Sequence, residues 1–301
     1  MLDRVNPAPA QDLDVTVVLP AFNEAGHIGQ EIERITDALK DCGRSFEILV
    51  VDDGSTDGTA EAVEGLPFVR LMRFPVNRGS GTARRIGTQQ ARGRYVVWTD
   101  ADLTYTNERI PEFLDILDTG RAQQVVGART SEEGTYKFLR VPAKWAIRRL
   151  AEFLTQSRIP DLNSGLRAFS KDAARPYLGL LPAGFSCVTT ITLAFLANGL
   201  VVEYVPIAYR PRAGRSHFHP IKDAYRYILQ VVRMVTFFEP LRVFGPIALT
   251  LLAVGLGKFA YDMATEPFKI AINTLLLLVT GLMLFSLGLL ADLIVRVNRR
   301  D

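Results

Sequence analysis

Two long apolar segments near the C-terminal end of this 301-residue chain restrict its fold more than any other feature. Residues 270–290 contain no charged side chain and are long enough to cross a lipid bilayer as a helix. Residues 243–261 form a second such segment, whose one charge, Lys258, lies near the end, where a lysine can extend to the membrane surface. We therefore predict two transmembrane helices within residues 241–301, with a pair of buried core helices as the alternative.

Residues 219–240, just before the first apolar segment, have the pattern of an amphipathic helix. Apolar side chains recur at helical spacing, at Ile221, Tyr225, Ile228, Val232 and Val235. Lys222, Arg226 and Arg233 lie off this stripe and give the helix a basic face. We predict that this helix lies on the membrane surface, with packing against the preceding domain as the alternative.

Net charge and cysteine content argue against two classes of protein. The formal net charge is +3, which does not fit nucleic-acid binding driven by a strongly basic surface, and we expect no nucleic-acid partner. Cys42 and Cys187 are the only cysteines and are far apart in the sequence. They provide neither a disulfide framework nor the spacing of a zinc site.

Between residues 15 and 218 the chain alternates between apolar runs and helical patterns. The runs typical of strands are residues 15–19, 46–51, 69–73, 95–99 and 124–128. Helices are indicated for residues 28–39, 60–64 and 82–91. This alternation predicts an α/β domain with a mostly parallel sheet and helices on both faces. Residues 1–14 contain two prolines and no long apolar run, and we expect a flexible arm there.

Three of the predicted strands are followed by carboxylates, at Glu24, Asp52, Asp53, Asp100 and Asp102. In a parallel sheet these strand ends share one edge, which is where α/β proteins bind ligands. Asp100 and Asp102 are one residue apart and, in an extended segment, point to the same side. Such a pair suits a hard cation, Mg²⁺ or Mn²⁺, that takes its other ligands from substrate phosphates and water.

Position in the chain decides how this pair is interpreted. Asp12 and Asp14 have the same spacing but precede an apolar run, so spacing alone does not identify a metal site, and a surface turn is the alternative. Three acidic strand ends on one edge favour the ligand site. The loop after residues 15–19 reads Pro-Ala-Phe-Asn-Glu and lacks the Gly-x-Gly-x-x-Gly fingerprint, which argues against a dinucleotide-binding dehydrogenase.

Four motifs stand in order along the chain: Val-Val-Leu-Pro-Ala-Phe-Asn-Glu at 17–24, Val-Val-Asp-Asp-Gly-Ser-Thr-Asp-Gly-Thr at 50–59, Asn-Arg-Gly-Ser-Gly-Thr-Ala-Arg at 77–84 and Asp-Ala-Asp at 100–102. With them the chain resembles the inverting family 2 glycosyltransferases of the Rossmann-like GT-A fold, and most closely the dolichyl- and polyprenyl-phosphate mannose and glucose synthases. The resemblance covers roughly residues 15–216. It implies transfer of mannose or glucose from a GDP- or UDP-linked sugar to polyprenyl or dolichyl phosphate, with Mg²⁺ or Mn²⁺ as cofactor.

The resemblance also implies roles for individual residues. Four residues would contact the base and ribose of the donor: Pro20, Ala21, Glu24 and Asp53. The metal would be held by Asp100 and Asp102, with Asp102 acting in catalysis. Residues 209–217 resemble a loop that closes over the donor, in which Arg212 would contact it. Ser80 and His217 depart from the family pattern, because each stands where lysine is usual.

Basic residues in the second half of the domain are candidates for the acceptor phosphate. Arg129 ends a predicted strand at the ligand edge, and planar guanidinium groups suit phosphate oxygens. Arg140 and Lys144 are four apart and share one face if Arg140 is helical. The resemblance places the acceptor phosphate near Arg129 and Arg140, which would act in catalysis, with Lys144 as a further phosphate contact.

Asp161 belongs to residues 160–167, which match the family's Asp-x-x-Ser-Gly-Phe-Arg segment with Leu166 in place of Phe. A catalytic base is often assigned to this aspartate. The nucleophile would be a phosphate monoester, which is mostly dianionic at neutral pH and needs little deprotonation. Asp161 is thus a candidate for positioning a group as well as for removing a proton, and a plain structural turn is the alternative.

Basic residues also indicate the orientation in the membrane. Arg242 precedes the first apolar segment, and Arg296, Arg299 and Arg300 follow the second. The positive-inside tendency places both ends, and with them the α/β domain, on the cytoplasmic side of a membrane whose lipids are further partners. A homo-oligomer is left open.

Two other functions fit parts of the sequence. The first is a processive membrane polysaccharide synthase, but its Gln-x-x-Arg-Trp signature has no counterpart beyond Lys144-Trp145, and two spans are few for a polymer channel. The second is a non-catalytic membrane scaffold with a degenerate transferase domain. The intact Asp100 and Asp102 argue against it, and the departures at Ser80 and His217 leave it open.

Overall fold

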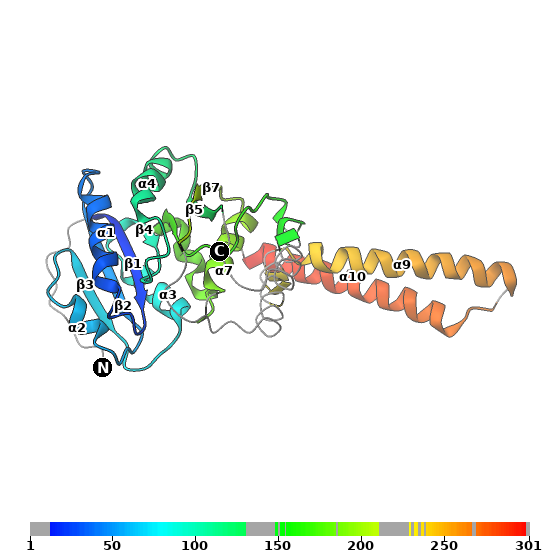
Figure 1. Cartoon of the computed structure of the whole chain (residues 1–301). Coiled ribbons are helices and arrows are strands. Elements are labelled where there is room, and N and C mark those ends of the chain that lie inside the picture. Colours follow the sequence, from blue (N-terminus) through cyan, green and yellow to red (C-terminus); the bar gives the residue numbers. More distant parts are fainter. Residues whose placement is uncertain are drawn as a thin grey trace.

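The computed structural model describes residues 13–130, 148–149, 151–153, 155–184, 186–210, 239–266 and 269–298, with residues 229, 232–233 and 236–237. Figure 1 shows an α/β domain from which two long helices extend side by side as a hairpin. Of the expected flexible arm over residues 1–14, residues 1–12 lie outside the described residues, whereas Leu13 and Asp14 begin the first strand. Most of the expected amphipathic helix over residues 219–240 also lies outside the described residues.

A seven-stranded sheet forms the centre of the α/β domain, in the order β3-β2-β1-β4-β6-β5-β7 (Figure 1). The strands are β1 (Leu13–Ala21), β2 (Phe46–Asp52), β3 (Val69–Arg73), β4 (Gly93–Trp98), β5 (Gln124–Arg129), β6 (Arg167–Ser170) and β7 (Val202–Ile207). Neighbouring strands are parallel, except that β6 runs antiparallel to both β4 and β5. The mostly parallel sheet is therefore confirmed, and its first five strands are the predicted ones.

The two remaining strands, β6 and β7, are not among the predicted strands. β6 has only four residues and begins with Arg167, whose charge hides the strand pattern. β7 lies at one edge of the sheet and contains Pro206, which an edge strand tolerates. Because β6 is antiparallel, Arg167 pairs with Trp98 at the end of β4. The segment before β6 therefore lies at the same edge as the carboxyl ends of the parallel strands.

Helices cover both faces of the sheet. The longer ones are α1 (Ile28–Lys40), α3 (Ser80–Gln90), α4 (Ile110–Asp118) and α7 (Cys187–Ala197), and the short ones are α2 (Thr59–Val63), η1 (Asn107–Arg109), α6 (Lys171–Ala174) and η2 (Arg175–Leu180). Alternate residues of β1 enter two cores: Val17 packs with α1 and α4, whereas Val18 packs with α3 and α7. The apolar stripe of α1 is buried as its spacing predicts, and each such side chain stabilises the domain by about 1.5–3 kcal/mol.

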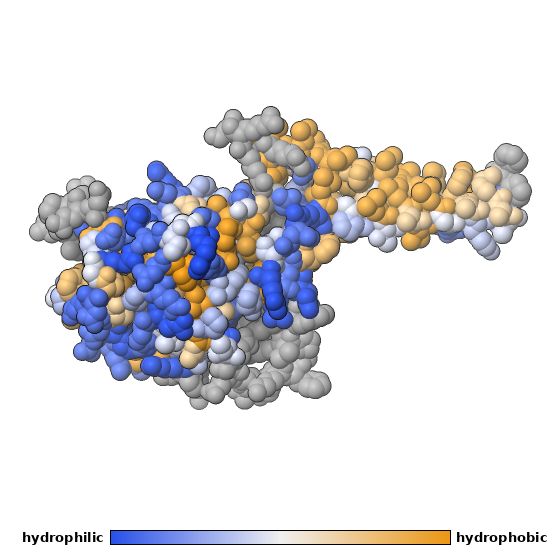
Figure 2. Space-filling view, turned by 90° about the horizontal axis from the view of Figure 1, so that it is seen from above, coloured by the Kyte–Doolittle hydropathy of each residue, from blue (hydrophilic) through white to orange (hydrophobic). Residues whose placement is uncertain are grey.

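The two predicted transmembrane segments form the hairpin helices α9 (Pro240–Thr265) and α10 (Ile272–Asn298). At 1.5 Å per residue each helix is about 40 Å long, more than the hydrocarbon core of a bilayer requires. Their large apolar side chains are mostly exposed and form the orange surface of the hairpin in Figure 2. An exposed apolar surface of this size is unfavourable in water, which argues against buried core helices and for a membrane hairpin.

Close packing and one buried carboxylate join the two hairpin helices. A Cβ atom on Gly255 would lie 2.8 Å from Leu278 Cδ2, so the small residue allows the helices to approach closely. Asp262, near the end of α9, accepts a hydrogen bond of 2.5 Å from Thr274 Oγ1 of α10. Its second oxygen pairs with Lys258 Nζ at 2.9 Å, so the charge of Lys258 is paired within the hairpin.

Candidate active site

The loops after β1 and β2 are held together by hydrogen bonds at the carboxyl edge of the sheet. Asn23 N donates to Ser55 Oγ over 2.9 Å, and Thr56 N donates to Asn23 Oδ1 over 2.9 Å. Glu24 N donates to Thr59 Oγ1 over 2.9 Å. Asn23 has a φ of 57°, a left-handed conformation that asparagine adopts more readily than most residues. The first two motifs therefore form one ordered surface.

Asp53, expected at the donor, is 2% exposed and organises the loop before α3. Its backbone N–H donates to Ala21 O over 2.8 Å. Its carboxylate accepts from Arg78 N at 2.7 Å and from Gly79 N at 2.8 Å, one oxygen for each. The structure thus brings Ala21 and Asp53 together, with Pro20 half-buried beside Ala21 in β1. Donor contacts by these residues stay a prediction.

Glycines at the start of α3 allow a second segment to pack against it. A Cβ atom on Gly79, which has a φ of +90°, would lie 2.4 Å from Ala183 O. A Cβ atom on Gly81 would lie 2.1 Å from Pro182 O. Gly81 N donates a hydrogen bond to Ala183 O over 2.7 Å. Ser80 lies between them, and within the described part of the chain its hydroxyl has no hydrogen-bond partner.

Asp100 and Asp102 follow β4 as expected, but their surroundings differ. The Asp100 side chain is 30% exposed, and its Oδ1 pairs with the guanidinium of Arg84. Asp102 is 7% exposed, and its Oδ1 accepts from Thr104 Oγ1 at 2.6 Å. Ala101 between them is buried in the core, and the chain bends over residues 101–103. The two carboxylates are therefore chemically unequal.

The segment before β6 packs directly on Asp100. Tyr105 Oη accepts a hydrogen bond of 2.6 Å from Gly165 N. A Cβ atom on Gly165 would lie only 2.6 Å from Asp100 Oδ2, so glycine alone fits there. Burial raises the pKa of Tyr105 well above its ordinary value, so its phenol stays neutral. Residues far apart in sequence thus meet at one carboxylate.

Arg129 and Asp161 form a bidentate ion pair at the same edge. Arg129 Nε donates to Asp161 Oδ2 over 2.7 Å, and Arg129 Nη2 donates to Oδ1 over 3.0 Å. Asn163 N also donates to Asp161 Oδ1, over 2.9 Å. Burial acts to raise the pKa of Asp161, but the bonds from Arg129 outweigh it and leave the pKa below its ordinary value. Asp161 is therefore ionised at neutral pH and holds Arg129 in place.

The guanidinium of Arg129 lies 5.2 Å from the ring centre of Tyr209. Tyr209 is the first residue of the expected donor loop, residues 209–217, of which the structure describes Tyr209 and Arg210. Three further site residues expected from the sequence, Arg140, Lys144 and Arg212, lie outside the described residues, as does His217.

A buried polar chain behind Asp102 involves Glu31 of α1, which sequence reasoning missed. Glu31 is fully buried, accepts a hydrogen bond from Asn107 Nδ2, and pairs with Arg34 Nη1 at 2.9 Å. Asn107 Oδ1 in turn accepts from Thr99 Oγ1 at 2.8 Å, next to Asp100. Burial and the nearby Asp102 raise the pKa of Glu31 to about 7, against the effect of Arg34.

Sequence signals for the missed residues exist. Glu31 lies three residues after Ile28 and four before Ile35, so it interrupts the apolar stripe of α1. Arg84 shares the buried face of α3 with Gly81 and Thr88, at spacings of three and four. A charge on a buried helix face marks a partner elsewhere in the core, because buried charges are rarely left unpaired.

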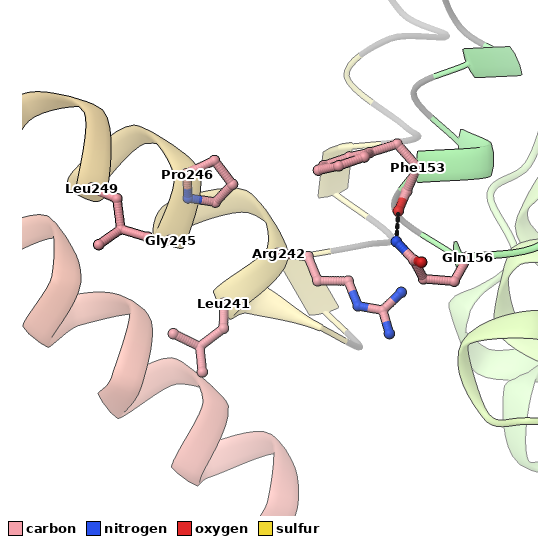
Figure 3. Close-up of a pocket in the computed structure, with 7 residues that line it drawn as sticks. All are labelled: Phe153, Gln156, Leu241, Arg242, Gly245, Pro246 and Leu249. Carbon is pink, nitrogen blue, oxygen red and sulfur yellow. Dashed lines mark hydrogen bonds between the residues drawn. The ribbon is translucent and has the colours of Figure 1, made fainter.

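Two adjoining cavities lie where the α/β domain meets the hairpin. Figure 3 shows the first, of about 500 Å³, lined by Phe153, Gln156, Leu241, Arg242, Gly245, Pro246 and Leu249. The second, of about 980 Å³, shares Phe153 and Gln156 with the first and has three arginines in its wall, Arg148, Arg149 and Arg158. Pro160 also lines it, next to Asp161 in the chain. The second cavity therefore adjoins the start of α9 through the first, and its wall carries three arginines and Glu152.

Comparison with known proteins identifies both parts of the chain. Residues 16–178 match the model of glycosyl transferase family 2, and residues 239–297 match the GtrB C-terminal hairpin. The dodecaprenyl-phosphate galacturonate synthase of Rhizobium johnstonii is 26% identical over 97% of this chain and 91% of that protein. A dolichyl-phosphate hexose transferase of Haloferax volcanii is 33% identical over 69% of this chain and 87% of that protein.

A solved structure has the same fold. The glucosyl-3-phosphoglycerate synthase of Mycobacterium tuberculosis, in complex with Mn²⁺, UDP and glucosyl-3-phosphoglycerate, matches with a TM-score of 0.58. It is 21% identical, and the match covers 78% of this chain and 87% of that one. The GT-A fold expected from the sequence is thereby confirmed. Since the family model also matches more than half of the chain, the protein belongs to glycosyl transferase family 2, carries a GtrB-type C-terminal hairpin, and is a glycosyltransferase.

Proposed function

We propose that the protein transfers a hexose, mannose or glucose, from a GDP- or UDP-linked donor to polyprenyl or dolichyl phosphate, with inversion at the anomeric carbon. The observation that carries the proposal is that one sheet edge holds both a carboxylate pair, Asp100 and Asp102, and a fixed guanidinium, that of Arg129, in a chain that also has a long apolar helical hairpin. Two relatives support this acceptor class, since one is a dodecaprenyl-phosphate galacturonate synthase and the other a dolichyl-phosphate hexose transferase.

Asp100 and Asp102 fit a divalent cation, Mg²⁺ or Mn²⁺, because carboxylate oxygens are the ligands such ions prefer. Among the described residues no group of three or more His, Cys, Asp or Glu side chains is placed to hold a metal. The proposed ion would take its other ligands from the donor diphosphate and water. The relative solved with Mn²⁺ supports the assignment. Bound there, the ion would stabilise the charge that develops on the leaving diphosphate.

Donor recognition is proposed for the ordered surface formed by the loops after β1 and β2. Pro20, Ala21 and Glu24 would contact the base and ribose from one loop. Asp53 would do so from the other while its carboxylate holds the loop before α3. Arg212 would contact the donor from the loop that follows Tyr209.

Acceptor binding is proposed for Arg129, with Arg140 and Lys144 as further phosphate contacts. Its guanidinium is already fixed by the two hydrogen bonds that it donates to Asp161, so little side-chain freedom is lost when a phosphate binds. The phosphate monoester is largely dianionic at neutral pH and attacks without a strong base. Asp161 therefore positions Arg129, a role supported by its lowered pKa.

The division of the chain into domains is also part of the proposal. We propose a glycosyltransferase domain over residues 15–218, an amphipathic connector over residues 219–240 and the membrane hairpin over residues 241–301, preceded by a flexible arm. By the positive-inside tendency we propose the cytoplasmic side for the domain, because Arg242 lies in the first turn of α9, Arg296 in the last turn of α10, and Arg299 and Arg300 follow it. The cavity at the start of α9 adjoins a second cavity with three arginines in its wall, and we propose that a lipid phosphate enters the site past these arginines.

Purified protein in liposomes, supplied with polyprenyl phosphate and a panel of GDP- and UDP-linked sugars, tests the proposal. Arg129→Ala should lower kcat/KM for the lipid phosphate roughly ten- to hundredfold, the equivalent of a charged hydrogen bond worth about 1.5–3 kcal/mol. Nucleotide binding should stay near the wild-type level. Arg121→Ala, which breaks an exposed ion pair with Glu203, is the matched control. It should change neither kcat/KM for the lipid phosphate nor nucleotide binding.

Equal loss of acceptor and nucleotide binding would show that Arg129 does not serve the acceptor. A product that grows by several sugars would instead indicate a processive synthase, and no transfer from any donor would indicate a scaffold.

A further inference from the structure

We propose that Arg84 is a positioning residue of the metal site. Its buried guanidinium pairs with one oxygen of Asp100, so that Asp102 is the principal metal ligand. The metal then binds together with the donor diphosphate. This inference rests on the proposed function, because it concerns how the same site holds its cation.

Arg84 has the burial and contacts of a fixed internal cation. It is 1% exposed, and its Nη2 pairs with Asp100 Oδ1. The guanidinium carbon lies 5.8 Å from the ring centre of Trp98, which is itself fully buried. Trp98 Nε1 donates to Thr88 Oγ1 over 2.9 Å, one turn further along α3, so the ring beneath the guanidinium is also fixed.

Arg84 has few potential partners other than Asp100. Within the described part of the chain its Nε and Nη1 atoms have no hydrogen-bond partner. Besides Asp100, the neighbouring ionisable groups are the Cys187 thiol, the Tyr105 phenol and the second buried guanidinium, Arg167. Separating Asp100 from Arg84 would leave a buried charge unpaired, which is strongly unfavourable.

The second oxygen of Asp100 is also restricted. Asp100 Oδ2 would be 2.6 Å from a Cβ atom on Gly165, so the backbone of the segment before β6 lies against it. With Oδ1 engaged by Arg84, Asp100 offers a metal at most this one oxygen. The Asp100, Asp102 and Arg84 side chains together carry a net charge of −1, not the −2 of two carboxylates alone.

A divalent cation facing a net charge of −1 gains less from the protein than one facing two free carboxylates. Its remaining charge is balanced when the donor diphosphate supplies oxygens. We therefore expect Mn²⁺ alone to bind weakly and Mn²⁺ with a nucleoside diphosphate to bind tightly.

Mn²⁺ binding to the full-length protein in detergent, followed by electron paramagnetic resonance without donor sugar or acceptor, tests this inference. Arg84→Met should raise the affinity for Mn²⁺ alone by on the order of tenfold, because it removes a positive charge next to the ligands. Arg84→Lys should keep the wild-type affinity. Arg70→Met is the matched control, since Arg70 pairs with a buried carboxylate, Glu47, in β2, away from the site.

An unchanged or reduced Mn²⁺ affinity in a folded Arg84→Met protein would overturn the inference. If that variant does not fold, the double variant Arg84→Met with Asp100→Asn removes both buried charges. Its affinity for Mn²⁺ alone should equal that of the wild type if Asp102 is the principal ligand, and a large loss would overturn the inference. No Mn²⁺ binding by the wild type, even with UDP or GDP, would contradict the metal site itself and with it the proposed function.

Discussion

Exchange of the buried Glu31 for glutamine should change how stability depends on pH. Glu31 has its pKa raised from 4.5 to about 7, mainly by burial. The folded protein therefore binds the proton more tightly than the unfolded chain does, and stability falls as pH rises from about 4.5 through about 7. The shift of about 2.5 pKa units corresponds to on the order of 3 kcal/mol of unfolding free energy.

Glu31→Gln removes the titration but keeps an oxygen for the hydrogen bond from Asn107. The unfolding free energy of the variant, relative to wild type, should therefore increase by on the order of 3 kcal/mol between pH 4.5 and pH 8.5. Urea unfolding in detergent, followed by the fluorescence of the buried Trp98, measures this difference. Glu33→Gln, on the exposed face of the same helix, is the control and should leave the pH dependence as in the wild type. Parallel pH profiles of wild type and Glu31→Gln would refute the reasoning.

Three further predictions follow from the site and the hairpin. Asp161→Asn should raise the KM for lipid phosphate and lower the unfolding free energy by about 3–5 kcal/mol, since Arg129 loses its buried partner; loss of the acid limb of the pH–rate profile would instead mark Asp161 as a base. Gly165→Ala should lower kcat by about tenfold or more, because its Cβ would displace Asp100, and normal turnover would show that Asp100 tolerates movement. A cysteine at Thr265, in a cysteine-free background, should react with an impermeant thiol reagent from the membrane side opposite the α/β domain, and labelling from the same side would contradict the hairpin orientation.

Much of the fold could be predicted because local pattern and tertiary structure agree there. The first five strands are apolar runs of ordinary length, and the apolar stripe of α1 faces the core that its spacing indicates. β6 and β7 could not be predicted so readily. Four residues beginning with the buried Arg167 carry no strand signal of their own, and Pro206 lowers the strand propensity of β7.

For the site, positions could be predicted and partners could not. Asp100 and Asp102 lie at the predicted strand end because strand polarity follows from the alternation of strands and helices. Their unequal surroundings depend on Arg84, reached from α3, and on the antiparallel β6, which places the segment before it against β4. The Arg129–Asp161 pair likewise joins residues 32 apart in sequence. Contacts of this kind can be inferred only when the topology is known.

The most direct test of the account compares two carboxylates of the same motif spacing at opposite strand ends. Asp14, at the amino end of β1, accepts a hydrogen bond of 3.1 Å from Ser45 N. Asp102, beyond the carboxyl end of β4, accepts similarly from Thr104 N at 3.3 Å. The measurement is kcat for sugar transfer to polyprenyl phosphate in Asp102→Asn and Asp14→Asn proteins, with and without chelator. We expect Asp102→Asn to lower kcat by about a hundredfold or more, Asp14→Asn to change it little, and chelation to abolish wild-type turnover until Mg²⁺ or Mn²⁺ is restored. Turnover that survives both chelation and the Asp102 exchange would contradict the metal–diphosphate site on which the account depends.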